Sequence, residues 1–273
     1  MKDILKEVIS RIEPEKNDYC RIRHKKGWIE YLEDGDLIFA PDELHRTLRR
    51  VIDTKENRPR GDKLLFLRNT RNTNPQYTAR EDGTPYRPEE ALERFIIVSN
   101  PDNFYYQVPI GGRKESVDMG IKEGKSKFIF VELKPWDSVN SPLYAIVESL
   151  KNFIEYRIIL ERKIATNNTF DEVELLILAP KEYYKAYNLI DDTGKYRAEK
   201  ISIVRVTLNK LSSEFQVRIS LMALQLDKDS FFRSCKRLYQ NKKLSGQKKV
   251  SVLGADPIPN LARNDWKLVV SSA

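Results

Sequence analysis

The stretch Glu115–Trp136, ESVDMGIKEGKSKFIFVELKPW, reads as two strands joined by a short turn. The runs 115–121 and 127–134 flank the tetrapeptide Glu-Gly-Lys-Ser, a pattern that is typical of a β-hairpin. The second run contains the continuous apolar segment 128–131, as in a strand that is buried on both faces, and its charged residues follow only at the end. Pro135 then ends the hydrogen-bonded ladder. The hairpin therefore places charged groups at the exit of a buried strand.

The charged residues of this hairpin are expected to share one face. Side chains alternate along a strand, so Glu132 and Lys134 point to the same side. In an antiparallel hairpin that pairs Asp118 with Glu132, Glu123 pairs with Lys127 and a three-residue glycine-containing loop remains, which is an acceptable turn. A slip of one residue would place Asp118 on the opposite face. The favoured register therefore gathers two carboxylates and one amine.

An acid on one strand, followed by acid-x-Lys on the next, resembles the motif of the PD-(D/E)XK nuclease superfamily, whose fold is restriction-endonuclease-like. Here the motif is Asp118 and then Glu132-Leu133-Lys134. The family places a further acid on the helix before the sheet, and RPEEALERFIIV offers Glu93, with Glu90 as the rival position. The resemblance covers the segment 87–180. It implies a metal-dependent nuclease that hydrolyses the phosphodiester bonds of DNA.

The resemblance also implies roles for these residues. Asp118 and Glu132 would bind Mg²⁺ (or Mn²⁺), together with the backbone carbonyl of Leu133, and Glu93 would complete the site. Magnesium takes one or two protein carboxylates and assists phosphodiester cleavage by neutralising charge and activating water. Lys134 would hold or activate the attacking water. Neighbouring carboxylates raise the pKa of Lys134 and burial lowers it, and we expect this lysine to stay an ammonium donor.

Two features depart from the family pattern. Val117 stands where the family has a proline-like residue before the first acid. Asn152 and Tyr156 are spaced like the Gln-x-x-x-Tyr motif of RecB-like members of the superfamily, with Asn in place of Gln.

Glu-x-Lys is also an ordinary charge pair on a solvent-facing strand, so the motif alone leaves a purely structural interpretation open.

The element order predicts an α/β protein with a mixed central sheet and flanking helices. Its restriction-endonuclease-like αβββαβ core would carry N-terminal and C-terminal additions. A helix begins at Pro88, a strand covers 104–108 before the hairpin, a helix capped by Ser141 runs to Lys163, and a buried strand over 172–179 completes the core. Further expected elements are strands at 201–208 and 215–224, a helix at 228–240, and a loosely structured basic tail over 241–273 with strands at 250–253 and 266–270.

Three regions are expected. Residues 1–86 form an N-terminal α+β region and a candidate DNA-binding or specificity subdomain, 87–225 the nuclease-like core with a sheet extension, and 226–273 a basic C-terminal helix and tail. Within the first region we expect an amphipathic helix over 4–12, a helix from Pro41, short strands at 37–39 and 63–67, and a long loop over 68–88.

The net charge of +8 favours a polyanionic partner, with DNA as the first candidate and RNA left open. Arg113, Lys114, Lys122 and Lys125 belong to the hairpin region that carries the acids and are expected to hold a phosphate backbone beside the metal. Arg68 and Arg71, in the long loop, are expected to grip DNA.

Composition excludes several classes of site. Two cysteines and two histidines cannot build a disulfide framework or a zinc centre, which favours a cytoplasmic protein with reduced thiols. The chain has no signal-peptide pattern, no apolar run of membrane-spanning length and no Walker sequence. The alternatives to a nuclease are a nucleic-acid-binding protein that keeps the fold without catalysis and an interaction or assembly module. A homodimer, the sequence specificity and the choice between endonuclease and exonuclease action stay open.

Overall fold

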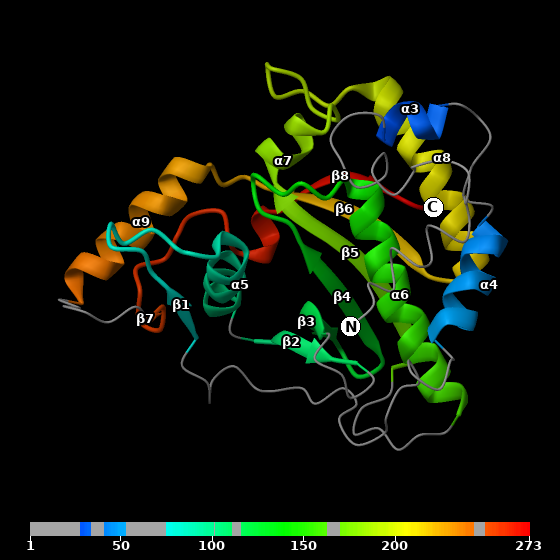
Figure 1. Ribbon diagram of the computed structural model, residues 1–273, viewed down its shortest axis with the longest axis horizontal. Coiled ribbons are helices and arrows are strands. Elements are labelled where there is room, and N and C mark those ends of the chain that lie inside the picture. The colour runs from blue at the N-terminus through cyan, green and yellow to red at the C-terminus, as the bar shows by residue number, and fades with distance from the viewer. Residues whose placement is uncertain are drawn as a thin grey trace.

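The computed structural model describes residues 28–33, 41–52, 75–100, 102–110, 116–162, 170–242 and 249–273 (Figure 1). The expected N-terminal helix, the expected strands at 37–39 and 63–67, and the basic residues Arg68, Arg71, Arg113 and Lys114 lie outside these ranges.

A six-stranded mixed sheet forms the centre of the molecule, in the order β2-β3-β4-β5-β6-β8. The first three strands are antiparallel, β4, β5 and β6 run parallel, and β8 is antiparallel to β6 at the edge. The mixed α/β class expected from the sequence is therefore confirmed. The strands are β2 (Phe104–Pro109), β3 (Ser116–Glu123), β4 (Lys127–Leu133), β5 (Glu172–Pro180), β6 (Arg218–Leu224) and β8 (Lys267–Ser271).

Helices cover both faces of this sheet (Figure 1). One apolar core contains residues of α3 (Trp28–Glu33), α4 (Pro41–Ile52), α6 (Pro142–Glu161), α7 (Lys181–Ala186) and α8 (Ala198–Phe215). The other core contains residues of α5 (Pro88–Ser99), α9 (Lys228–Asn241) and the small sheet of β1 (Gln76–Thr78) and β7 (Lys249–Ser251). A short 3₁₀ helix, η3 (Arg263–Asp265), precedes β8.

The expected hairpin has the expected register. Glu123 pairs with Lys127 and Met119 pairs with Val131, so the position numbers of partners sum to the same constant throughout. Gly124 lies in the three-residue turn with a φ of 64°, a conformation that glycine adopts without steric cost. The order α5-β2-β3-β4-α6-β5 also agrees with the expected sequence of elements.

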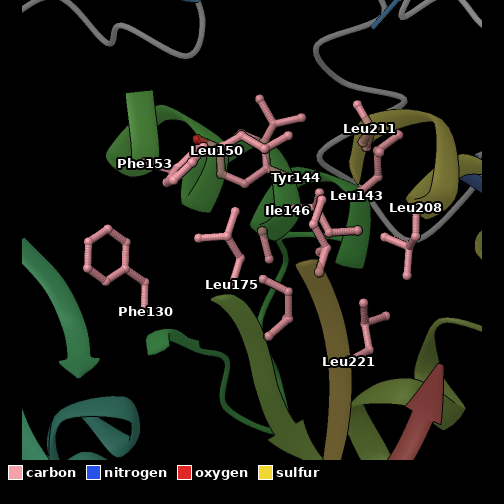
Figure 2. Packing of buried hydrophobic residues seen from close by; sticks show 14 of the residues in the cluster. Phe130, Leu143, Tyr144, Ile146, Leu150, Phe153, Leu175, Leu208, Leu211 and Leu221 are labelled. Carbon is pink, nitrogen blue, oxygen red and sulfur yellow. The ribbon is translucent and has the colours of Figure 1, made fainter. Parts of the chain in front are cut away.

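Helix α6 connects the parallel strands β4 and β5 and lies on one face of the sheet, where its apolar side chains pack against those of the strands (Figure 2). The hydroxyl of Ser141 accepts a hydrogen bond from the backbone N–H of Tyr144 at 3.1 Å and caps the helix. The packed residues labelled in Figure 2 include Phe130 on β4, Leu175 on β5, Leu221 on β6, and Leu143, Ile146, Leu150 and Phe153 on α6.

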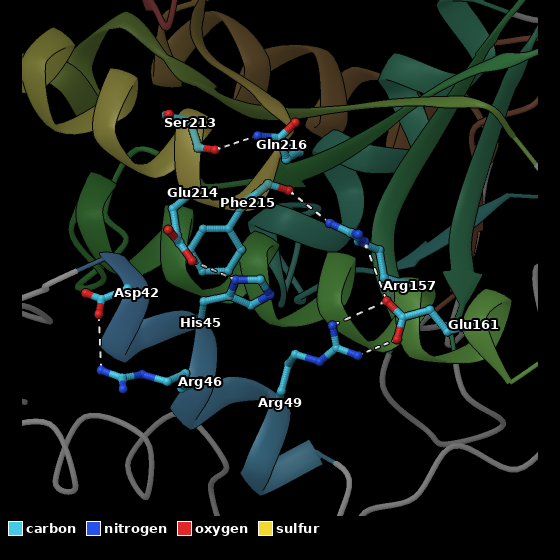
Figure 3. Close-up of polar contacts among 10 residues, drawn as sticks. All are labelled: Asp42, His45, Arg46, Arg49, Arg157, Glu161, Ser213, Glu214, Phe215 and Gln216. Carbon is cyan, nitrogen blue, oxygen red and sulfur yellow. Dashed lines mark hydrogen bonds and ion pairs between the residues drawn. The ribbon is translucent and has the colours of Figure 1, made fainter.

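Polar contacts join α4 to α6 and α8 (Figure 3). His45 Nδ1 lies 3.0 Å from a carboxylate oxygen of Glu214. Arg49 forms an ion pair with Glu161, with one contact at 3.3 Å. Both pairs are partly exposed, so their effect on the free energy of unfolding is small beside that of the apolar side chains under α4.

The expectation of a strand at 201–208 is wrong, because these residues lie in α8. Ile201, Val204, Leu208 and Leu211 are buried at helical spacing. The run is rich in β-branched residues, and packing of this stripe against α3, α4 and β8 outweighs their strand propensity. The strand expected at 215–224 is present as β6 from Arg218 onward, but Phe215 belongs to the end of α8, and the helix expected at 228–240 is confirmed as α9.

The C-terminal segment is more ordered than a loose tail. Within residues 249–273, β7 pairs with β1 and β8 pairs with β6, so this segment contributes one strand to each of the two sheets. These pairings cross the boundaries expected at 86 and 225. Within the described ranges, no helix has both the length and the apolar character that a membrane crossing requires.

Candidate functional site

The three residues of the hairpin motif meet at the end of β4. Asp118 Oδ2 accepts a hydrogen bond from the backbone N–H of Leu133 at 2.8 Å. Lys134 Nζ lies 2.5 Å from Glu132 Oε1. Continuing the ladder of β3 and β4 by one pair sets Asp118 opposite Glu132. The backbone N–H of Lys134 donates to the carbonyl of Leu178 at 2.9 Å, which fixes the end of β4 against β5.

A second acid, from α6, holds the lysine. Lys134 Nζ lies 3.1 Å from Glu148 Oε2, so the ammonium bridges Glu132 and Glu148. The side chains of Lys134 and Glu132 are each only 5 % exposed. Burial lowers the pKa of Lys134, but the charges of Glu132, Glu148, Asp118 and Glu89 outweigh it and raise the pKa well above its ordinary value. This direction agrees with the expectation of a charged ammonium.

The carboxylates of the site repel one another. Burial raises the pKa of Asp118 to about 7, and the charges of Glu89 and Glu148 add to this effect, against the opposing influence of Lys134 and the Leu133 N–H. The pKa of Glu132 is raised well above its ordinary value by burial and by Asp118 and Glu148. One ammonium cannot balance several clustered acids. The site therefore favours binding of a proton or an additional cation.

Helix α5 contributes Glu89 to the site, in addition to the expected acid Glu93. Glu93 is buried and forms an ion pair with Arg94 at 3.0 Å. Glu90 lies 3.7 Å from the same guanidinium. Glu89 instead interacts electrostatically with Lys134 and the other acids, and burial raises its pKa. Burial has the largest effect on the pKa of Glu93 and raises it, and the charge of Asp118 raises it further. Glu93 is therefore close enough to Asp118 to interact with it while it stays paired with Arg94.

Two sequence signals were available for the missed acids. Glu89 and Glu93 are four residues apart and share a helix face, so the choice of Glu93 already pointed to the face that carries Glu89. Glu148 is four residues before Asn152, the residue compared with the Gln-x-x-x-Tyr motif. The approach of Glu148 to the lysine depends on how α6 lies on the sheet, which the spacing does not show.

Tyr156 lies near the start of β5, at the end of the sheet opposite to the acids. Its hydroxyl accepts from the N–H of Phe170 at 2.9 Å, and it stacks edge-on against Phe130 with ring centroids 5.6 Å apart. The neighbouring Asp171 N–H donates to Ser126 in the hairpin turn. Tyr156 therefore anchors the start of β5 near the turn, and the RecB-like spacing of Asn152 and Tyr156 does not bring the tyrosine to the acids.

Lys122, Lys125 and Lys127 lie toward the turn of the hairpin, away from Asp118 and Glu132. Lys122 is four residues from Asp118, or about 13 Å along a strand, and Lys125 is in the turn. Lys127 forms ion pairs with Glu174 at 2.9 Å and with other acids near the turn. Lys122 and Lys125, the described lysines expected to hold a phosphate, therefore lie toward the turn end of the hairpin, while Asp118 and Glu132 lie toward its other end.

The oxygen donors at the end of β4 suit a hard divalent cation in type. Asp118 and Glu132 supply carboxylates and Leu133 a main-chain carbonyl, and magnesium requires only one or two protein carboxylates. Among the described residues, no group of three or more His, Cys, Asp or Glu side chains has the arrangement of a metal cage. A cation at this site would thus retain several water molecules as ligands.

Comparisons of the chain with protein-family models, curated proteins and solved structures give no significant match.

Proposed function

We propose that the chain is a metal-dependent nuclease with a restriction-endonuclease-like core, which hydrolyses phosphodiester bonds of DNA. The observation that carries the proposal is the meeting of Asp118, Glu132 and Lys134 at the end of β4, with a buried ammonium among carboxylates. A charge pair on a solvent-facing strand would be exposed, whereas Lys134 and Glu132 are buried. Strongly shifted pKa values in such a cluster are typical of functional sites.

Each residue has a role in this proposal. Asp118, Glu132 and the Leu133 carbonyl would hold Mg²⁺ or Mn²⁺, which supplies charge neutralisation and activates water when bound. Lys134 donates hydrogen bonds from its ammonium to the attacking water or a phosphoryl oxygen and stabilises the charge that develops there. Since its pKa is raised, Lys134 does not act as the base. Glu148 positions Lys134 through the 3.1 Å contact.

A nucleic-acid-binding protein without catalysis is the second candidate. The observation that favours it is the close contact between Lys134 and Glu132, in which the lysine occupies one oxygen of a carboxylate that metal binding requires. In this case the buried pair would stabilise the end of β4 and nothing more. The two candidates differ in whether the wild-type protein cleaves DNA in a way that substitution of Asp118 abolishes.

The test is cleavage of plasmid DNA in Mg²⁺ or Mn²⁺ by wild type, Asp118→Asn and Lys134→Ala. We expect each substitution to reduce the rate by about a hundredfold or more, because loss of one preorganised electrostatic group has effects of this size. Glu172→Gln is the matched control, since Glu172 is an exposed acid at the opposite end of the sheet. Wild-type rates in both site variants would disprove the assignment. Equal loss in the control would indicate a structural effect.

A further inference from the structure

A tight turn before α5 presents an exposed tyrosine. Tyr86 is 62 % exposed, more than any other large apolar or aromatic side chain of the described residues. The guanidinium of Arg80 lies 5.8 Å from the centroid of its ring. Arg87, also exposed, follows directly at the start of α5. A solvent-exposed aromatic ring therefore has one guanidinium group over its face and a second exposed arginine next to it in the chain.

The turn that carries Tyr86 is held firmly. Its two arms are joined by hydrogen bonds from the Tyr86 N–H to the Thr78 carbonyl and from the Arg80 N–H to the Thr84 carbonyl, both at 2.7 Å. The Asp82 carboxylate accepts from the Thr84 N–H at 2.9 Å and from its hydroxyl at 2.6 Å. The ring is thus presented by a preorganised segment, which reduces the entropy lost on binding.

The turn is also anchored to α9. The Tyr77 hydroxyl donates to the carbonyl of Cys235 at 2.9 Å. Gly83, at a φ of 81°, packs so closely on α9 that an added Cβ would lie 3.0 Å from the Cβ of Tyr239. The exposed ring is therefore fixed relative to the α5–α9 layer rather than carried on a free loop.

The position of Tyr86 relates it to the acids. Tyr86 is three residues before Glu89, so their Cα atoms are at most about 11 Å apart. Glu89 interacts electrostatically with Lys134 and Asp118. Val139, which is 53 % exposed, follows Lys134 by five residues in the loop before α6. The segment before Glu89 and the segment after Lys134 therefore each carry an exposed apolar or aromatic side chain.

We propose that Tyr86 and Arg80 bind single-stranded nucleic acid next to the acids, Tyr86 by stacking on an unpaired base and Arg80 and Arg87 by contacts to the backbone phosphates. This inference rests on the proposed nuclease function. Aromatic rings stack on bases of any sequence, but only on bases that are not paired within a duplex. The guanidinium groups supply the charge that a phosphate requires. The substrate would therefore contain a single-stranded segment at the site of cleavage.

The experiment measures fluorescence anisotropy of a labelled single-stranded oligonucleotide and of the matching duplex, at one fixed salt concentration and with divalent cations removed. We expect Tyr86→Ala to weaken single-strand binding about fivefold to a hundredfold, the range for loss of one stacked base, and Tyr86→Phe to bind as wild type does. Tyr196→Ala is the matched control, because Tyr196 is 41 % exposed on a separate loop before α8. It should bind unchanged.

Several outcomes would overturn the inference: unchanged binding by Tyr86→Ala, an equal loss in Tyr196→Ala, a duplex that binds as tightly as the single strand, or no binding by the wild type. The plasmid cleavage assay with Asp118→Asn, run beside this binding assay, separates the two proposals. If Asp118→Asn stops cleavage while Tyr86→Ala leaves single-strand binding intact, only the stacking contact fails. If Tyr86→Ala weakens binding while no variant or wild type cleaves, only the nuclease function fails.

Discussion

Asp118 shows how a single residue reflects its surroundings. Its carboxylate accepts a backbone hydrogen bond at 2.8 Å, which favours the charged form, yet burial and two neighbouring acids raise its pKa to about 7. Burial and the neighbouring acids therefore outweigh the opposing effects of Lys134 and of the Leu133 N–H on the pKa of Asp118. A bound divalent cation would reverse this balance.

Stability of the metal-free protein is expected to fall as the pH rises from about 4 to 7. The pKa of Asp118 is 3.8 in its ordinary state and about 7 in the folded protein, so over this interval the folded state holds a proton that the unfolded state has lost. Thermal unfolding at several pH values measures the effect. Asp118→Asn should make the free energy of unfolding less dependent on pH. At pH 7 this free energy should differ between the variant and the wild type by on the order of 1 kcal/mol or more.

Mg²⁺ provides the control for this prediction. Because the cation competes with the proton for the same carboxylate, added Mg²⁺ should raise the melting temperature more at pH 7.5 than at pH 5.5. An equal shift at both pH values, or the same shift in Asp118→Asn, would show that Asp118 does not bind the ion.

At the scale of elements, the hairpin of β3 and β4 depends on one close approach. Gly120 lies opposite Phe130 in the ladder, and an added Cβ would be 2.2 Å from Cζ of Phe128. Phe128 is fully buried and its ring stacks on Phe170 with centroids 4.5 Å apart. The ring cannot swing away without disturbing this stack. Gly120 is thus required by packing, and the hairpin that carries the site depends on it.

Gly120→Ala should reduce the free energy of unfolding by about 1–3 kcal/mol, the usual cost of overpacking a core. Urea denaturation monitored by circular dichroism measures the change. Gly124→Ala is a useful comparison, since an added Cβ there meets no atom within 4 Å, and its cost would come from the positive φ alone. If Gly120→Ala is as stable as wild type, Phe128 can repack and the proposed constraint is wrong.

In the molecule as a whole, the C-terminal strand β8 forms one edge of the central sheet. β8 pairs with β6, and the Ser272 N–H donates to the carbonyl of Ile219 at 2.9 Å. Val270 on this strand is buried, whereas Leu268 is 53 % exposed. A segment more than 130 residues after the hairpin that carries the proposed catalytic residues therefore belongs to the same folded unit.

Val270→Ala should reduce the free energy of unfolding by about 2 kcal/mol, because it removes buried methyl groups and leaves a cavity. Leu268→Ala should change it by less than about 0.5 kcal/mol, since the larger side chain is mostly in solvent. Chemical denaturation of both variants tests the pair. Equal effects would mean that β8 does not pack on the sheet as described.

Local pattern was sufficient for the hairpin, for α6 with its Ser141 cap and for β5, because each has a strong period or an unambiguous turn signal. It was insufficient for α8. The β-branched residues of this helix favour a strand locally, and only burial of the stripe that contains Val204 and Leu208 against other elements decides for a helix.

The amino-acid sequence was enough to predict that Asp118, Glu132 and Lys134 lie on one face, because side chains alternate along a strand and a three-residue turn sets Asp118 opposite Glu132. The presence of Glu89 and Glu148 beside them follows from the packing of helices on the sheet. These two acids reach the lysine through the placement of α5 and α6 on the sheet. That placement is set by side-chain packing between residues distant in the chain, and no local spacing encodes it.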